Sequence, residues 1–116
     1  MIHEVTDENF EREVADSDVP CLIEFTGAWC SLCEKLLPTL EELAGRYDGR
    51  VKFCTVNTDD QRDLRIKFAV AALPYLVYVA NGQMTPLFDE YVTLERLQER
   101  LDYMLAGNQA PTTRPL

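Results

Sequence analysis

The sequence is poor in several features that mark particular classes of protein. Lysine and arginine total 11 against 20 acidic residues, and no basic stripe interrupts the net charge of -9, so we expect no nucleic-acid partner. The longest nearly apolar run, residues 68–80, is too short to span a bilayer and contains Pro74, so we expect no membrane partner. Internal repeats and low-complexity segments are absent, which argues against a solenoid and against disorder.

Cysteine is also scarce, with four residues at positions 21, 30, 33 and 54. This number is too small for a disulfide-scaffold protein. The first eight residues lack the basic region and apolar core of a signal peptide, and we therefore expect a cytoplasmic protein. Cys21 and Cys54 fall in predicted strands and are expected to be inert core residues, since a disulfide between them is not favoured in a reducing cytosol.

What the sequence does contain fits one compact α/β domain, since 116 residues of which 47% are apolar can bury a sizeable core. Apolar runs predict strands, and apolar residues at helical spacing predict helices, in the order β-α-β-α-β-α-β-β-α. This order predicts a mixed central sheet flanked by helices on both faces, with Asn81-Gly82 as the hairpin turn. We expect the domain to cover residues 1–106 and residues 107–116 to form a flexible tail.

Cys30 and Cys33 lie where the apolar strand 21–25 gives way to a helical pattern from about residue 30 to 47. At a helix N-terminus, unpaired N–H groups and the helix dipole stabilise a thiolate, and a second thiol one turn away can complete an exchange with a disulfide. The alternatives are a structural thiol pair or half of a zinc site. A structural zinc site usually takes four protein ligands, whereas this chain offers one Cys-x-x-Cys pair and one distant histidine, His3. Zinc is therefore the weaker hypothesis, and we expect neither a metal nor a cofactor.

Several motifs in order along the chain resemble the thioredoxin family. They are Trp29-Cys30-Ser31-Leu32-Cys33 after a strand, Pro38 within the next helix, Leu73-Pro74-Tyr75 before a strand, the Asn81-Gly82 hairpin and an amphipathic last helix. The resemblance covers the chain up to about Ala106 and implies the thioredoxin fold and a thiol–disulfide oxidoreductase. It further implies that Cys30 is the attacking nucleophile and Cys33 the resolving thiol.

The resemblance also implies roles for residues around the cysteines. Trp29 would flank the site and contact substrate, and Pro74 would be a cis-proline whose preceding residue, Leu73, pairs through its backbone with an extended substrate segment. Tyr75 would place a bulky group near that substrate groove. Glu24 matches the position of a buried acid that exchanges a proton with the resolving cysteine.

The motif departs from the family's usual pattern inside and beside the cysteine pair. Ser31-Leu32 stands where Gly-Pro is usual, and Glu34 puts a negative charge where lysine is frequent. A nearby anion disfavours a thiolate. Glu24 is one methylene longer than the usual aspartate, and Thr55 replaces a lysine that often neighbours that acid. These departures leave the redox direction open.

The sequence therefore predicts a monomeric disulfide reductase that acts on disulfide-containing proteins in cell redox homeostasis and electron transport. The resemblance implies a thioredoxin reductase as the partner that resets it. Two alternatives remain. One is a specialised oxidant, isomerase or single-partner exchanger, and the other is a thioredoxin-fold binding module with little turnover.

Overall fold

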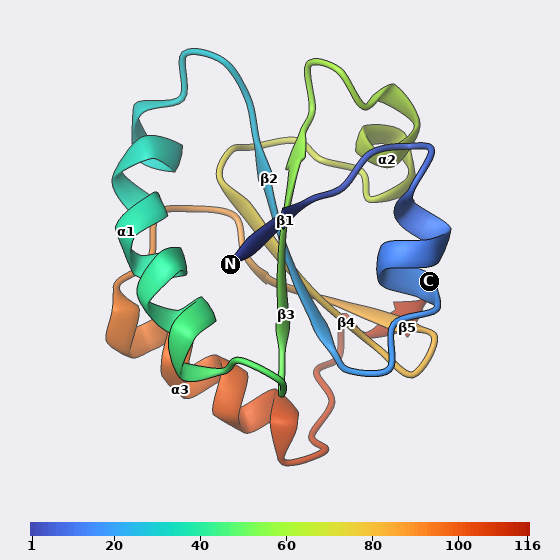
Figure 1. Cartoon of the computed structure of the whole chain (residues 1–116), viewed down its shortest axis with the longest axis vertical. Coiled ribbons are helices and arrows are strands. Elements are labelled where there is room, and N and C mark those ends of the chain that lie inside the picture. Colours follow the sequence, from blue (N-terminus) through green and yellow to red (C-terminus); the bar gives the residue numbers. More distant parts are fainter.

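The computed structural model describes all 116 residues, and it contains one six-stranded sheet with helices on both faces (Figure 1). The sheet order is β1-β3-β2-β4-β5-β6. In chain order the elements are β1 (Ile2–Glu4), a short π-helical segment η1 (Glu11–Ala15), β2 (Cys21–Thr26), α1 (Ser31–Arg46), β3 (Lys52–Asn57), α2 (Arg62–Lys67), β4 (Tyr75–Ala80), β5 (Gln83–Phe88), α3 (Leu94–Leu105) and β6 (Arg114–Pro115). No helix combines the length and the apolar character that crossing a bilayer requires.

The sheet is mixed, as the sequence predicts. β1, β3 and β2 run parallel, whereas β4 is antiparallel to β2, and β5 is antiparallel to β4. Asn81 and Gly82 both have positive φ, 55° and 72°, as a two-residue turn matching the twist of a hairpin requires. The turn joins β4 to β5, which confirms the hairpin that the sequence predicts at Asn81-Gly82.

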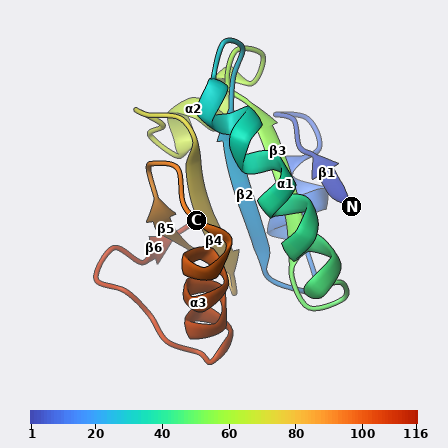
Figure 2. The same cartoon turned by 90° about the vertical axis from the view of Figure 1, so that its left-hand side faces the viewer.

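Two apolar cores lie on opposite faces of the sheet, and Figure 2 shows α1 and α3 together on one of them. On that face Leu36 and Leu40 of α1 pack with Leu97 and Leu101 of α3, which confirms the helical stripes read from the sequence. The other core lies under η1 and α2. There the ring centroids of Phe25 and Phe68 are 5.1 Å apart.

The C-terminal segment differs from the flexible tail that the sequence predicts. Its last residues form β6, which pairs antiparallel with β5, and the Leu116 N–H donates to the Gly82 carbonyl at 2.9 Å. The hydroxyls of Thr85 and Thr113 share a hydrogen bond of 2.7 Å. The free edge of β5 supplies backbone partners that the local sequence of the tail does not reveal.

The N-terminus of α2 is capped from a distant part of the chain. The capping group is the carboxylate of Asp7. It accepts from the N–H groups of Asp63 at 3.2 Å and Leu64 at 3.0 Å. This cap ties the segment after β1 to α2 and leaves Asp59 free for a contact with the turn that carries the cysteines.

Candidate active site

The cysteine pair sits at the N-terminus of α1, directly after the turn that follows β2. Cys30 and Cys33 form a disulfide, with their Cα atoms 5.3 Å apart. Cys30 is the N-cap residue of α1, and its Sγ accepts a hydrogen bond from the Cys33 N–H at 3.2 Å. Cys30 is half-buried and Cys33 is 6% exposed. An incoming sulfur can therefore reach Cys30 far more easily than Cys33, while the helix terminus directs N–H groups at the Cys30 sulfur.

The turn before Cys30 is held by the loop between β3 and α2. Asp59 Oδ2 accepts a hydrogen bond of 2.7 Å from the Ala28 N–H. The Thr58 hydroxyl donates to the Thr26 carbonyl at 3.0 Å. Sequence reasoning missed this contact because Asp59 lies 31 residues beyond Ala28, and no local pattern links the two. The contact fixes the residue that leads into Trp29.

Trp29 projects from this turn with its side chain fully exposed and with a φ of 63°, a conformation that few non-glycine residues adopt. A large aromatic side chain held away from the protein gains nothing from internal packing. Its surface is therefore available to another molecule.

The segment before β4 comes close to the same turn. The Leu73-Pro74 peptide is cis, as the resemblance implies, and Pro74 is buried. A Cβ added at Gly27 would lie 3.0 Å from Leu73 Cδ1, so the close approach of these two segments favours glycine at this position.

A shallow groove of about 540 Å³ runs between the turn, α2 and the segment before β4. Its lining is mostly apolar and consists of Ala28, Trp29, Cys30, Ser31, Leu32, Thr58, Arg65, Val70, Ala71, Ala72 and Leu73. The structure therefore brings most of the predicted site residues to one groove beside Cys30. Four of them, Cys33, Glu24, Pro74 and Tyr75, do not line it. The ring of Tyr75 lies 5.8 Å from that of Phe25, in the core under α2.

Glu24 lies in the middle of β2, paired with Thr55 of β3 and Leu76 of β4. It is 5% exposed, and its Oε2 has no hydrogen-bond partner. Burial raises the pKa of Glu24 to about 7, and the Thr55 side chain opposes this shift. Alternation along β2 places Glu24 on the sheet face of Leu22, which is the face covered by α1. A carboxyl on that face that titrates near neutral pH can exchange a proton under physiological conditions.

The other two cysteines, Cys21 and Cys54, are free and buried in neighbouring strands of the core under η1 and α2. The adjacent Cys21 thiol and burial both raise the pKa of Cys54 above its ordinary range. Cys54 therefore stays a thiol, which agrees with the core role that the sequence predicts.

Comparisons with known proteins match this architecture. The thioredoxin family model covers residues 1–103. The chain is 33% identical to Thioredoxin 1 of Nostoc sp. over 99 residues, covering 85% of this chain and 92% of the relative. It is 38% identical to thioredoxin of Haemophilus influenzae over 80 residues, covering 69% and 75%. It is 29% identical to thioredoxin of Rickettsia felis over 104 residues, covering 90% and 96%.

The family model spans almost all of the chain, including the cysteine pair. The Cys-x-x-Cys pair stands where a strand meets a helix, the context in which such a pair carries out dithiol chemistry. The chain thus belongs to the thioredoxin family and is a protein-disulfide oxidoreductase.

Proposed function

We propose that the protein is a disulfide reductase in which Cys30 attacks and Cys33 resolves. In the reduced protein the Cys30 thiolate attacks one sulfur of a substrate disulfide. A mixed disulfide forms, and the first substrate thiolate leaves and takes up a proton. Cys33, deprotonated, then attacks the Cys30 sulfur and releases the second substrate thiolate. The substrate gains two electrons and two protons, and the protein ends with the Cys30–Cys33 disulfide.

The observation that carries this proposal is the unequal exposure of the two sulfurs in one disulfide. Cys30 is half-buried at the groove, and Cys33 is buried beneath it. A bulky protein substrate can reach the Cys30 sulfur. The Cys33 sulfur is shielded until the mixed disulfide has formed. The Cys33 N–H directed at Cys30 Sγ supports a thiolate at the attacking position.

Glu24 is the proposed proton acceptor for Cys33 during the second attack. It lies on the sheet face that α1 covers, and α1 carries Cys33. A group with a pKa of about 7 is present in both protonation states near neutral pH, so it can accept this proton and return it. A bridging water would serve as the path where the carboxyl does not reach the sulfur directly.

The groove beside Cys30 is the proposed substrate-binding site. An extended substrate segment would pair with the backbone of Leu73, just before the cis-proline Pro74, in the manner of an added strand. Trp29 and Leu32, both exposed, would contact its side chains. Tyr75 is left out of this role because it packs against Phe25.

We assign the enzyme to the cytoplasm, where a thioredoxin reductase would return it to the dithiol form for further electron transport. Two observations support this part of the proposal. Cys21 and Cys54 are side by side and free, as suits a reducing compartment. The relatives are named as thioredoxins.

A specialised oxidant or isomerase is the second candidate, because Ser31-Leu32 separates the cysteines. Glu34 favours the reductase over this candidate. Its carboxylate lies in the first turn of α1 and opposes the negative charge of a thiolate at Cys30. A dithiol whose thiolate is less stabilised gives up its electrons more readily.

Three measurements test the proposal. In insulin-disulfide reduction with dithiothreitol, Cys30→Ser is expected to lose activity and Cys54→Ala, which removes a buried thiol outside the site, to keep it. A reduction potential well below about -200 mV against glutathione is expected for a reductase. A potential near about -120 mV would establish the oxidant instead. Retained biological activity in the double variant Cys30→Ser, Cys33→Ser would favour a binding module.

A further inference from the structure

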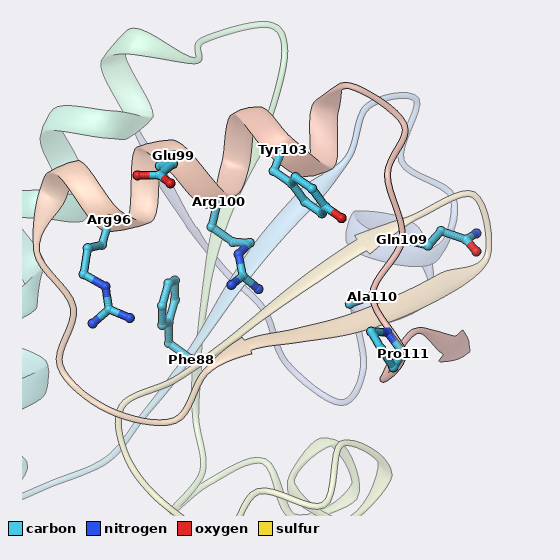
Figure 3. A pocket seen from close by; sticks show the side chains of 8 residues that line it. All are labelled: Phe88, Arg96, Glu99, Arg100, Tyr103, Gln109, Ala110 and Pro111. Carbon is cyan, nitrogen blue, oxygen red and sulfur yellow. The ribbon is translucent and has the colours of Figure 1, made fainter.

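A second cavity, of about 500 Å³, lies between the outer face of α3, the end of β5 and the C-terminal segment (Figure 3). It shares no lining residue with the groove beside Cys30. Four of its residues, Arg96, Glu99, Arg100 and Tyr103, follow one another at helical spacing on α3. Its volume is within the range of sites that hold small molecules.

Two arginines, Arg96 and Arg100, bring positive charge to this cavity. The guanidinium groups of Arg96 and Arg100 lie 5.3 Å and 5.6 Å from the ring centroid of Phe88, and Figure 3 shows that ring between them. Neither guanidinium takes part in any of the three ion pairs of the molecule. Asp89 and Glu90 line an adjoining hollow with both arginines, but neither forms an ion pair with them. Stacking on Phe88 orients the planar groups and leaves their N–H donors available.

The far wall is formed by the C-terminal segment, which lies beyond the residues matched by the family model. Gln109 and Pro111 line the cavity there. The segment is fixed in place by several bonds, including a hydrogen bond of 2.9 Å from Gln109 Nε2 to Gln83 Oε1 and the pairing of β6 with β5. The wall is therefore built before any ligand arrives, and it is a feature of this chain outside the matched domain.

We propose that this cavity binds small molecules that carry an oxyanion, a carboxylate or a phosphate, on a flat apolar body. Each guanidinium fork, one on either side of the Phe88 ring, matches the geometry of an oxyanion. The ring of Tyr103 and the face of Pro111 offer apolar surface to the body, and the Tyr103 hydroxyl is exposed and free to donate. Glu99 is the one carboxylate of the lining, and it weakens anion binding without cancelling two positive charges.

Binding is tested by titrating the whole protein at low salt and following the backbone amide signals of Tyr103 and Gln109 by NMR. The probes are AMP for a phosphate and benzoate for a carboxylate, with uncharged adenosine as the matched control. We expect saturable shifts below about 1 mM with at least one anion and none with adenosine. Binding of AMP would identify a phosphate as the recognised group, and binding of benzoate would identify a carboxylate. Equal shifts with adenosine, or no saturation with either anion, would overturn the proposal.

Substitutions of residues that line the cavity should weaken anion binding in some variants and strengthen it in another. Arg100→Gln and Arg96→Gln are each expected to weaken binding about tenfold, and Glu99→Gln to strengthen it several-fold. Arg62→Gln on α2 removes the same charge away from the cavity and is the control, expected to change nothing. Insulin reduction should be unaffected in all four, which shows that they fold. Equal weakening in Arg62→Gln would mean non-specific attraction, and saturation only by a hexaglutamate peptide would indicate a protein partner; either outcome overturns the proposal.

Discussion

The chain contains two pairs of neighbouring cysteines, and they differ in position, in exposure and in redox state. Cys30 and Cys33 lie at a helix N-terminus beside a groove and are joined as a disulfide. Cys21 and Cys54 lie within adjacent strands, free and shielded from solvent. One member of each pair lies on or near β2. Cys21 is the first residue of this strand, and Cys30 lies just past its end. The comparison shows that position in the fold, more than the presence of two thiols, decides which pair exchanges electrons.

The largest contrast between the pairs should be in activity. Cys30→Ser is expected to reduce insulin reduction by at least about a thousandfold, because no other exposed sulfur can attack, whereas Cys54→Ala should retain the rate within about twofold. The measurement is the turbidity of precipitating insulin chains. Comparable losses in both variants would remove the functional distinction between the two pairs.

Alkylation of the reduced protein should separate the pairs by rate. Iodoacetamide is expected to modify Cys30 first and to reach Cys21 and Cys54 about a thousandfold more slowly or slower still, because they become accessible only through rare opening of the core. Peptide mass spectrometry over time gives each rate. Adding urea at the unfolding midpoint should bring the rates together, and early modification of Cys54 would contradict the buried position.

Glu24 lies on β2, between Cys21 and Cys30 in the chain, and its titration should make the free energy of unfolding depend on pH. Its pKa is about 7 in the folded protein, against an ordinary value of 4.5. The unfolded chain therefore loses this proton first, so the free energy of unfolding should fall as pH rises from about 4.5 to 7 and level off above. The full loss is about 3 kcal/mol. Urea unfolding of Glu24→Gln across this range is expected to lack the slope, and an unchanged slope would exclude Glu24 as its source.

The smallest expected effect comes from removing the hydrogen bond between Asp59 and the Ala28 N–H, which holds the turn before Cys30. Asp59→Ala removes the acceptor for the Ala28 N–H and should cost about 1 kcal/mol, together with a several-fold loss of insulin reduction as the turn before Cys30 loosens. Asp60→Ala is the control, since this exposed neighbour makes no side-chain contact with the turn. If the two variants behave alike, Asp59 has no positioning role.

Local patterns were sufficient for much of the fold and for the centre of the site. The hairpin at Asn81-Gly82, the cap at Thr93 and the stripes of α1 and α3 all depend on residues a few positions apart, so the sequence shows them directly. The disulfide pair was predictable for the same reason, because the strand before it and the helix after it adjoin it in the chain.

The features that sequence reasoning missed depend on partners far apart in the chain. Asp59 meets Ala28, and Asp7 meets the first turn of α2, across 31 and more than 50 residues. The packing of Tyr75 against Phe25 is different, because a local signal for it existed. Leu76 and Tyr78 face the core under α1 and α3, and alternation then turns Tyr75 toward the opposite core.

The short strand β6 has a consequence for assembly. Without it, β5 would present six residues of open backbone along one margin of the sheet, which is a template for pairing with another copy of the chain. β6 covers part of that margin with only two residues, and one of them, Pro115, has no N–H to offer to a further strand. The opposite margin is the three-residue β1. β6 therefore covers β5 only at Gln83 and Met84, and it shortens the open backbone on which an edge-to-edge oligomer could grow.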